Sequence, residues 1–105
     1  MRSFYFVRDK RLGIDVPVMD GQWEDVPWEE RADILMRWEE IRGRIPDRIQ
    51  ELERMIVVKQ AALYEEEHFE TSCKINYEIA ELASMINDLH LWYRLHQEFD
   101  SKIHH

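Results

Sequence analysis

The chain has 105 residues, a length typical of one domain. Its composition is 45% hydrophobic and 34% charged with only three glycines and three prolines, which excludes a disordered or collagen-like chain and favours long helices. The net charge of −8, from 22 acidic and 14 basic side chains, argues against a general nucleic-acid binder. The single cysteine, Cys73, excludes an intrachain disulfide and a cysteine-based zinc site, and we expect it to pack as a small hydrophobic side chain.

Residues 1–24 predict a β-hairpin or an extended arm. Residues 4–7, Phe-Tyr-Phe-Val, are aromatic and β-branched and predict a short strand. Residues 8–13 indicate a turn, and residues 14–18 predict a second strand, which Pro17 confines to a sheet edge because proline has no amide donor. Since an isolated hairpin is marginally stable in water, we expect it to dock on helices or to pair with another chain.

Residues 25–105 predict a helical bundle, which forms a single domain with the hairpin. We expect a first helix to begin near Asp25-Val26-Pro27, with Asp25 as the cap and Pro27 in the first turn, and to end at Gly43; a second should run from Pro46 to about Glu66. Glycine and proline together favour a helix end between them. The apolar stripes of both helices repeat at steps of three, four or seven residues: Trp28, Ala32, Leu35, Trp38 and Ile41 in the first, and Ile49, Leu52, Ile56 and Leu63 in the second.

The third helix, expected from Phe69 to Phe99, has the most regular apolar pattern. Alternating steps of four and three residues, as in a coiled-coil seam, join Ile75, Ile79, Leu82, Ile86, Leu89 and Tyr93. Extending the stripe of the second helix in register places charged residues on it: Lys59, Glu66 and Glu70. We therefore expect a bend near residues 67–69 rather than one continuous rod, so that the last two of three helices form a long antiparallel hairpin in a mainly α fold.

Several apolar side chains of the third helix lie off this seam: Met85, Leu91, Trp92, Leu95 and Phe99. A small domain has little interior to cover a helix that is apolar on several sides. Either the first helix and the hairpin cover these side chains, or a second subunit does. We expect the second, a homodimer with Met85, Trp92, Leu95 and Phe99 at the interface. Core and interface roles both stay open for the four tryptophans: Trp23, Trp28, Trp38 and Trp92.

Around the expected bend, Phe69-Glu70 is followed by the small residues Ser72 and Cys73 and then by the apolar positions of the third helix. In this pattern the segment 52–82, about a third of the chain, resembles the UVR motif. This motif is the helical hairpin of the UvrB and UvrC excision-repair proteins and of some Clp-type chaperones and adaptors. The resemblance implies a bend near residue 68 and docking on a protein partner. The sequence departs from the motif in three ways: His68 replaces Asp, Asn76-Tyr77 replaces Arg-Asp, and the first half fits only with one or two extra residues before the bend.

Glu65 and His68 have a spacing that is used in metal sites. Three residues apart on a helix, a carboxylate and an imidazole lie side by side, as in ferritin-like di-metal proteins, where the pattern occurs twice. A two-fold dimer would supply the second copy, with further carboxylates from Glu39, Glu40 or Glu78. The alternative is an exposed charged turn. The remaining histidines give no such pattern: His90, His96, His104 and His105.

No nucleophile elbow, phosphate loop or Ser-His-Asp arrangement occurs, so we assign no catalytic or cofactor-binding residue. The N-terminus does not read as a signal peptide and no apolar run is long enough for a membrane span, so we expect a cytoplasmic protein without membrane or nucleic-acid partners. The predicted function is a non-catalytic helical interaction module or adaptor that self-associates. The alternatives are a carboxylate/histidine metal protein or enzyme assembled in a dimer, and a UVR-like docking element for a repair or chaperone machine.

Overall fold

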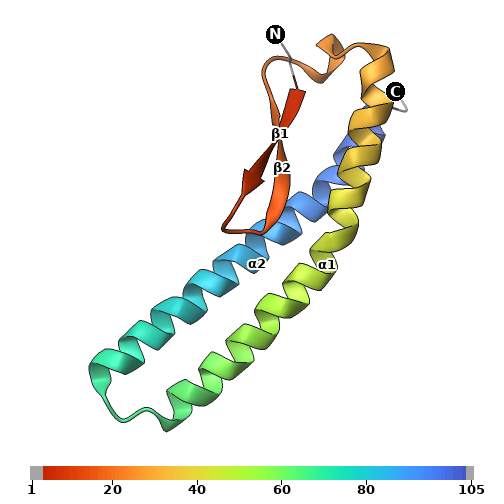
Figure 1. Ribbon diagram of the computed structural model, residues 1–105. Helices are drawn as coiled ribbons and strands as arrows, with labels where there is room; N and C mark the ends of the chain where they lie inside the picture. The colour runs from red at the N-terminus through yellow and green to blue at the C-terminus, as the bar shows by residue number, and fades with distance from the viewer. Residues whose placement is uncertain (1–3, 104–105) are drawn as a thin grey trace.

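The chain folds into a β-hairpin followed by two long antiparallel helices (Figure 1). In this computed structural model, residues 4–103 are described, with the side chains of residues 4–95. The elements in chain order are β1 (Phe4–Asp9), β2 (Ile14–Met19), a 3-10 turn η1 (Trp23–Asp25), α1 (Trp28–Glu65) and α2 (Phe69–Ile103). The mainly helical fold and the antiparallel helical hairpin are confirmed.

The predicted β-hairpin is confirmed, with strands slightly longer than expected. β1 and β2 pair antiparallel, with Phe6 opposite Pro17. Both strands of a two-stranded sheet are edges, so Pro17 is accommodated without loss of an interior ladder bond. The turn is closed by Asp9, whose backbone carbonyl accepts from the amide of Gly13 at 2.8 Å and whose Oδ1 accepts from the amide of Leu12 at 2.9 Å. Gly13 has a φ of +77°, a conformation that favours glycine.

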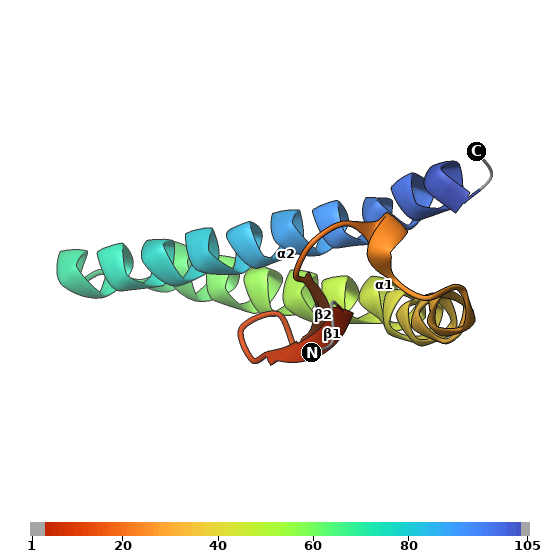
Figure 2. The same ribbon diagram turned by 90° about the horizontal axis from the view of Figure 1, so that it is seen from above.

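The expectation of three helices is wrong, because the first two form the single helix α1. Gly43 and Pro46 lie inside it. The amide that proline lacks would have bonded the carbonyl of Arg42, so one intrahelical hydrogen bond is lost. The burial of Ile45 outweighs this loss, because it connects the two predicted stripes into one buried row: Trp38, Ile41, Ile45, Ile49 and Leu52. Figures 1 and 2 show α1 changing direction in its yellow part, which holds the proline.

The expected break near residues 67–69 is confirmed, since α1 ends at Glu65 and α2 begins at Phe69. The amide of Glu66 donates to the carbonyl of Leu63 at 3.2 Å, and the Glu66 carboxylate accepts from the amide of His68 at 3.0 Å. These bonds satisfy backbone groups where the first helix stops and the chain reverses. The reversal therefore needs neither glycine nor proline.

The charged residue in the apolar stripe of α1, Lys59, forms an ion pair with α2. Its Nζ lies 3.0 Å from Oε2 of Glu78 on α2, and both side chains are partly buried. An ion pair between the two helices thus replaces one apolar contact of the seam.

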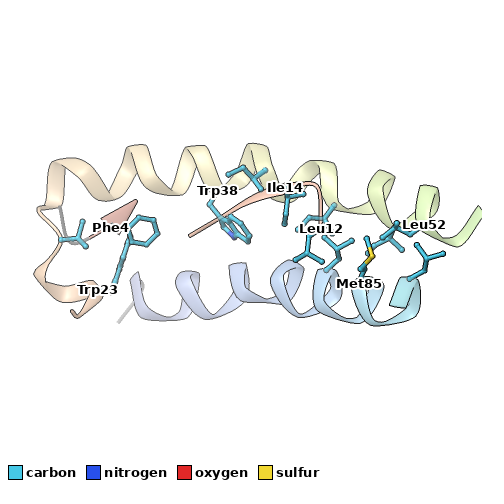
Figure 3. Close-up of a cluster of buried hydrophobic side chains, with 13 residues drawn as sticks. Phe4, Leu12, Ile14, Trp23, Trp38, Leu52 and Met85 are labelled. Carbon is cyan, nitrogen blue, oxygen red and sulfur yellow. The ribbon is translucent and has the colours of Figure 1, made fainter. Parts of the chain in front are cut away.

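The core is a continuous apolar layer between the hairpin and the helix pair (Figure 3). Among the described side chains, no charged or polar residue is buried. At one end Phe4 packs edge-on against Trp23 of η1, with ring centroids 5.9 Å apart. Arg31 of α1 holds η1 in place: its Nε donates to the carbonyl of Val26 at 2.9 Å and its Nη2 to that of Glu24 at 2.8 Å. The core continues through Leu12, Ile14 and Trp38 to Leu52, Leu82, Met85 and Leu89.

Candidate interaction surface

The turn of the β-hairpin is fixed to α2 by Arg11. Its Nη1 lies 2.7 Å from Oδ2 of Asp88, its Nε 3.0 Å from Oε1 of Glu81, and its Nη2 2.8 Å from Oγ of Ser84. The hydrogen bonds that Arg11 donates to the carboxylate of Asp88, and then to that of Glu81, raise the pKa of Arg11 above its ordinary value. The three α2 residues follow each other at steps of three and four, so they mark one face of this helix.

The hairpin also contacts α1. Nε of Arg48 donates to the carbonyl of Leu12 at 2.9 Å, and Nη2 of Arg37 lies 3.1 Å from Oδ2 of Asp15. The hairpin therefore lies across the same face of both helices. Figure 1 shows it beside the upper half of the pair, while the green and cyan ends of the helices extend beyond it.

The face that the hairpin covers continues uncovered toward residues 66–68. On α1, steps of three and four from Arg48 lead to exposed positions: Glu51, Met55, Val58 and Ala62. On α2, the same steps backward from Glu81 lead to Tyr77 and Lys74, also exposed. We call these six residues the arm face. An open groove runs along its α1 side, lined by Glu51, Arg54, Met55, Val58 and Lys59.

The ends of the arm face carry opposite charges. At the hairpin turn, three basic side chains are exposed: Lys10, Arg8, which is paired with Asp15, and Arg11, which is paired with Glu81 and Asp88. At the other end lies the acidic tip, which we define as Glu65, Glu66, Glu67 and Glu70. Two aromatic side chains flank this tip: Tyr64 is 89% exposed and Phe69 is 80% exposed.

The residues predicted at a dimer interface lie at the hairpin end of α2. Met85 is buried in the core of the chain, and Trp92 is half-buried with its ring edge-on against Trp38. Leu95 is half-buried and packs against the same core. The side chain of Phe99 lies outside the described residues. The structure thus uses Met85 and Trp92 to pack the chain's own helices, and the arm face contains neither.

A signal for the arm face is present in the sequence, where Met55 and Ala62 widen the apolar stripe of residues 49–63. Met55 and Ala62 belong to a second row, Glu51-Met55-Val58-Ala62, that runs alongside the core row of α1. A second apolar row on a helix indicates a second packing partner.

Glu65 and His68 do not share a helix face, because α1 ends at Glu65 and His68 lies between the helices. Glu78 is paired with Lys59, as described above. Within the part of the chain that the structure describes, no three His, Cys, Asp or Glu residues are placed to hold a metal ion. His90 is exposed; His104 and His105 lie outside the described residues, as does the side chain of His96.

Two further expectations concern cysteine and tryptophan. Cys73 is exposed, so the expectation that it packs as a small hydrophobic residue is wrong. Of the tryptophans, Trp23 and Trp38 are buried, whereas Trp28, at the start of α1, is 73% exposed.

Comparisons with protein families, with curated proteins and with solved structures found no match to this chain. Among the described residues, no helix combines the length and the apolar character needed to cross a membrane.

Proposed function

We propose that this chain is a non-catalytic helical interaction module that self-associates through the arm, the part of the helix pair beyond the hairpin. The observation that supports this is the set of large apolar side chains that the arm leaves in solvent: Met55, Val58, Tyr64, Phe69 and Tyr77. Large contiguous apolar surfaces on a folded domain mark interaction sites. Single exposed residues are common, but here they follow one another along one part of the molecule.

The geometry also favours an interaction role over catalysis. General acid–base chemistry depends on titratable groups in a concave, partly desolvated site. The groove beside Met55 and Val58 is open and mainly apolar. Such a surface is suited to receiving an apolar helix.

The test is the molar mass in solution, measured by light scattering during gel filtration over a wide range of concentration. Self-association predicts a mass near twice the 12.9 kDa of the chain, falling toward 12.9 kDa on dilution. A mass of 12.9 kDa at every concentration would contradict self-association and leave the arm as a surface for another protein.

A second candidate is a UVR-like docking element. It is favoured by the position of the break between the helices, directly before Phe69-Glu70, where the resemblance expects it. The test is affinity capture from native lysate with identification by mass spectrometry. Recovery of an excision-repair or Clp-type chaperone subunit, lost on Phe69→Ala, supports this role; recovery of neither contradicts it.

A further inference from the structure

We infer that the occupant of the arm face is a second copy of this chain, turned end for end so that the acidic tip of each copy lies against the basic hairpin turn of the other. This inference rests on the proposed self-association and adds the surface and the orientation. It concerns the arm, not the Trp92 region of α2 that the sequence suggested.

The extent of the arm face fits this arrangement. The hairpin turn limits the uncovered part of the helix pair at one end, because Arg48 donates to the carbonyl of Leu12 there and Arg11 donates to the carboxylate of Glu81. The linker at residues 66–68 ends it at the other. Between them α1 runs from Glu51 to Glu65, about 21 Å at 1.5 Å per residue. If a second arm is laid antiparallel in this space, both arms lie between the two β-hairpins, and the tip of each arm meets the hairpin of the other copy.

The row on α1 is suited to pairing with itself. If the two-fold axis passes beside Val58, this residue meets its own copy, and Met55 of one chain lies near Ala62 of the other, one large and one small apolar side chain. Alternation of large and small residues is what close packing of two helices needs. Val58 is 69% exposed in the single chain, so pairing buries most of its side chain.

The row on α2 supports the same axis. Two cross-helix contacts fix the level of the helices relative to each other: Lys59 to Glu78 and Arg42 to the carbonyl of Tyr93. They place Tyr77 at about the level of Val58. The same axis then brings Tyr77 near its own copy and Lys74 near Glu81 of the other chain, which is an attractive pair.

Charge selects the antiparallel orientation. In a parallel arrangement the two acidic tips would meet, and each carries four glutamates within residues 65–70. End-for-end pairing instead places each tip beside the hairpin turn of the other copy, where Lys10 is exposed and Arg11 is paired with Glu81 and Asp88 of its own chain. Complementary charges at the ends of an interface fix orientation and register.

The surface is tested with two matched substitutions, Val58→Arg and Val57→Arg. The two valines are adjacent and similarly exposed, 69% and 63%, but only Val58 lies on the arm face. We expect Val58→Arg to weaken dimerisation about a hundredfold or more, because it introduces a charge twice into an apolar contact. Val57→Arg should leave the dimer unchanged. Circular dichroism of both variants checks that the helices are intact.

The outcomes separate the two proposals. A wild-type chain that is monomeric at all concentrations overturns self-association. A dimer that survives Val58→Arg overturns the arm face as its interface and leaves self-association standing. A dimer lost in Val57→Arg and kept in Val58→Arg would place the interface on the other side of α1.

The orientation is tested by exchange of charge at Lys10 and Glu67, both exposed. Lys10→Glu or Glu67→Lys alone should weaken the dimer several-fold at low salt, and the double substitution should restore it. A parallel dimer gives the opposite result for Glu67→Lys, which would relieve repulsion between the tips and strengthen association. No effect of either substitution would also overturn the antiparallel orientation.

Discussion

The indole ring of Trp38 on α1 meets that of Trp92 on α2 edge-on, with ring centroids 6.0 Å apart and planes at 64°. Trp38 is fully buried. The pair connects the two helices at the hairpin end of the molecule, away from the arm face. Aromatic pairs in this geometry add stability beyond the area that they bury.

Replacing Trp38 by alanine should lower the free energy of unfolding by about 3–5 kcal/mol, the usual cost of removing a large buried aromatic side chain. Trp28→Ala is the matched control, because Trp28 is 73% exposed and its removal should change stability by less than about 0.5 kcal/mol. Urea denaturation measures both. Equal losses in the two variants would contradict the core position of Trp38.

Gly43→Ala should stabilise the chain by about 0.5–1 kcal/mol, the gain expected in a helix interior. A Cβ built on Gly43 meets no atom within 4 Å, so nothing opposes the gain. Gly13→Ala should do the reverse, since Gly13 has a φ of +77° and its Cβ would lie 2.9 Å from Nε of Arg48. Thermal melts compare the two, and destabilisation by Gly43→Ala would argue against a continuous α1.

Arg42→Ala should destabilise the helix pair by about 1–2 kcal/mol. The Arg42 side chain donates from Nε to the carbonyl of Tyr93 at 3.0 Å, and its guanidinium lies 4.0 Å from the centroid of the Tyr93 ring. Arg44→Ala controls for the loss of one positive charge, because Arg44 is exposed. The two melting temperatures should differ by several degrees, and coincident values would show that the contact to Tyr93 adds nothing.

The double substitution Lys59→Met/Glu78→Leu should match or exceed the wild-type chain in stability, by up to about 1–4 kcal/mol. It replaces the partly buried ion pair with the apolar contact that the neighbouring seam positions make. Each single substitution should be less stable than the double, since it leaves one charge without its partner. Urea unfolding of the wild-type chain, the two single variants and the double variant gives the coupling free energy between residues 59 and 78. Additive effects on the free energy of unfolding would exclude an interaction between them.

The local elements could be predicted because neighbouring residues determine them. The strands followed from Phe-Tyr-Phe-Val and from the alternation around Val16, and α2 followed from its regular seam. The single helix α1 could not be predicted from Gly43 and Pro46, because local preference favoured a stop there and the burial of Ile45 in the assembled core outweighed it.

The arm face depends on where the hairpin docks. No pattern in the sequence predicts that Arg11 pairs with Glu81 and Asp88, or that the hairpin ends at the level of Arg48. Trp92 was therefore expected on the outside, whereas the folded chain packs it against Trp38. Met55 and Val58 remain exposed because the hairpin does not extend to them.

The bonds of Arg11 to α2 also constrain the order in which the chain folds. Lys59 and Glu78 are separated by 19 residues, whereas Arg11 and Asp88 are separated by 77. Closing a long loop costs more entropy than closing a short one, so we expect the helices to associate from residues 66–68 outward before the hairpin docks. During synthesis the hairpin leaves the ribosome first, and the surface that buries Phe4, Leu12 and Ile14 exists only once α2 has emerged.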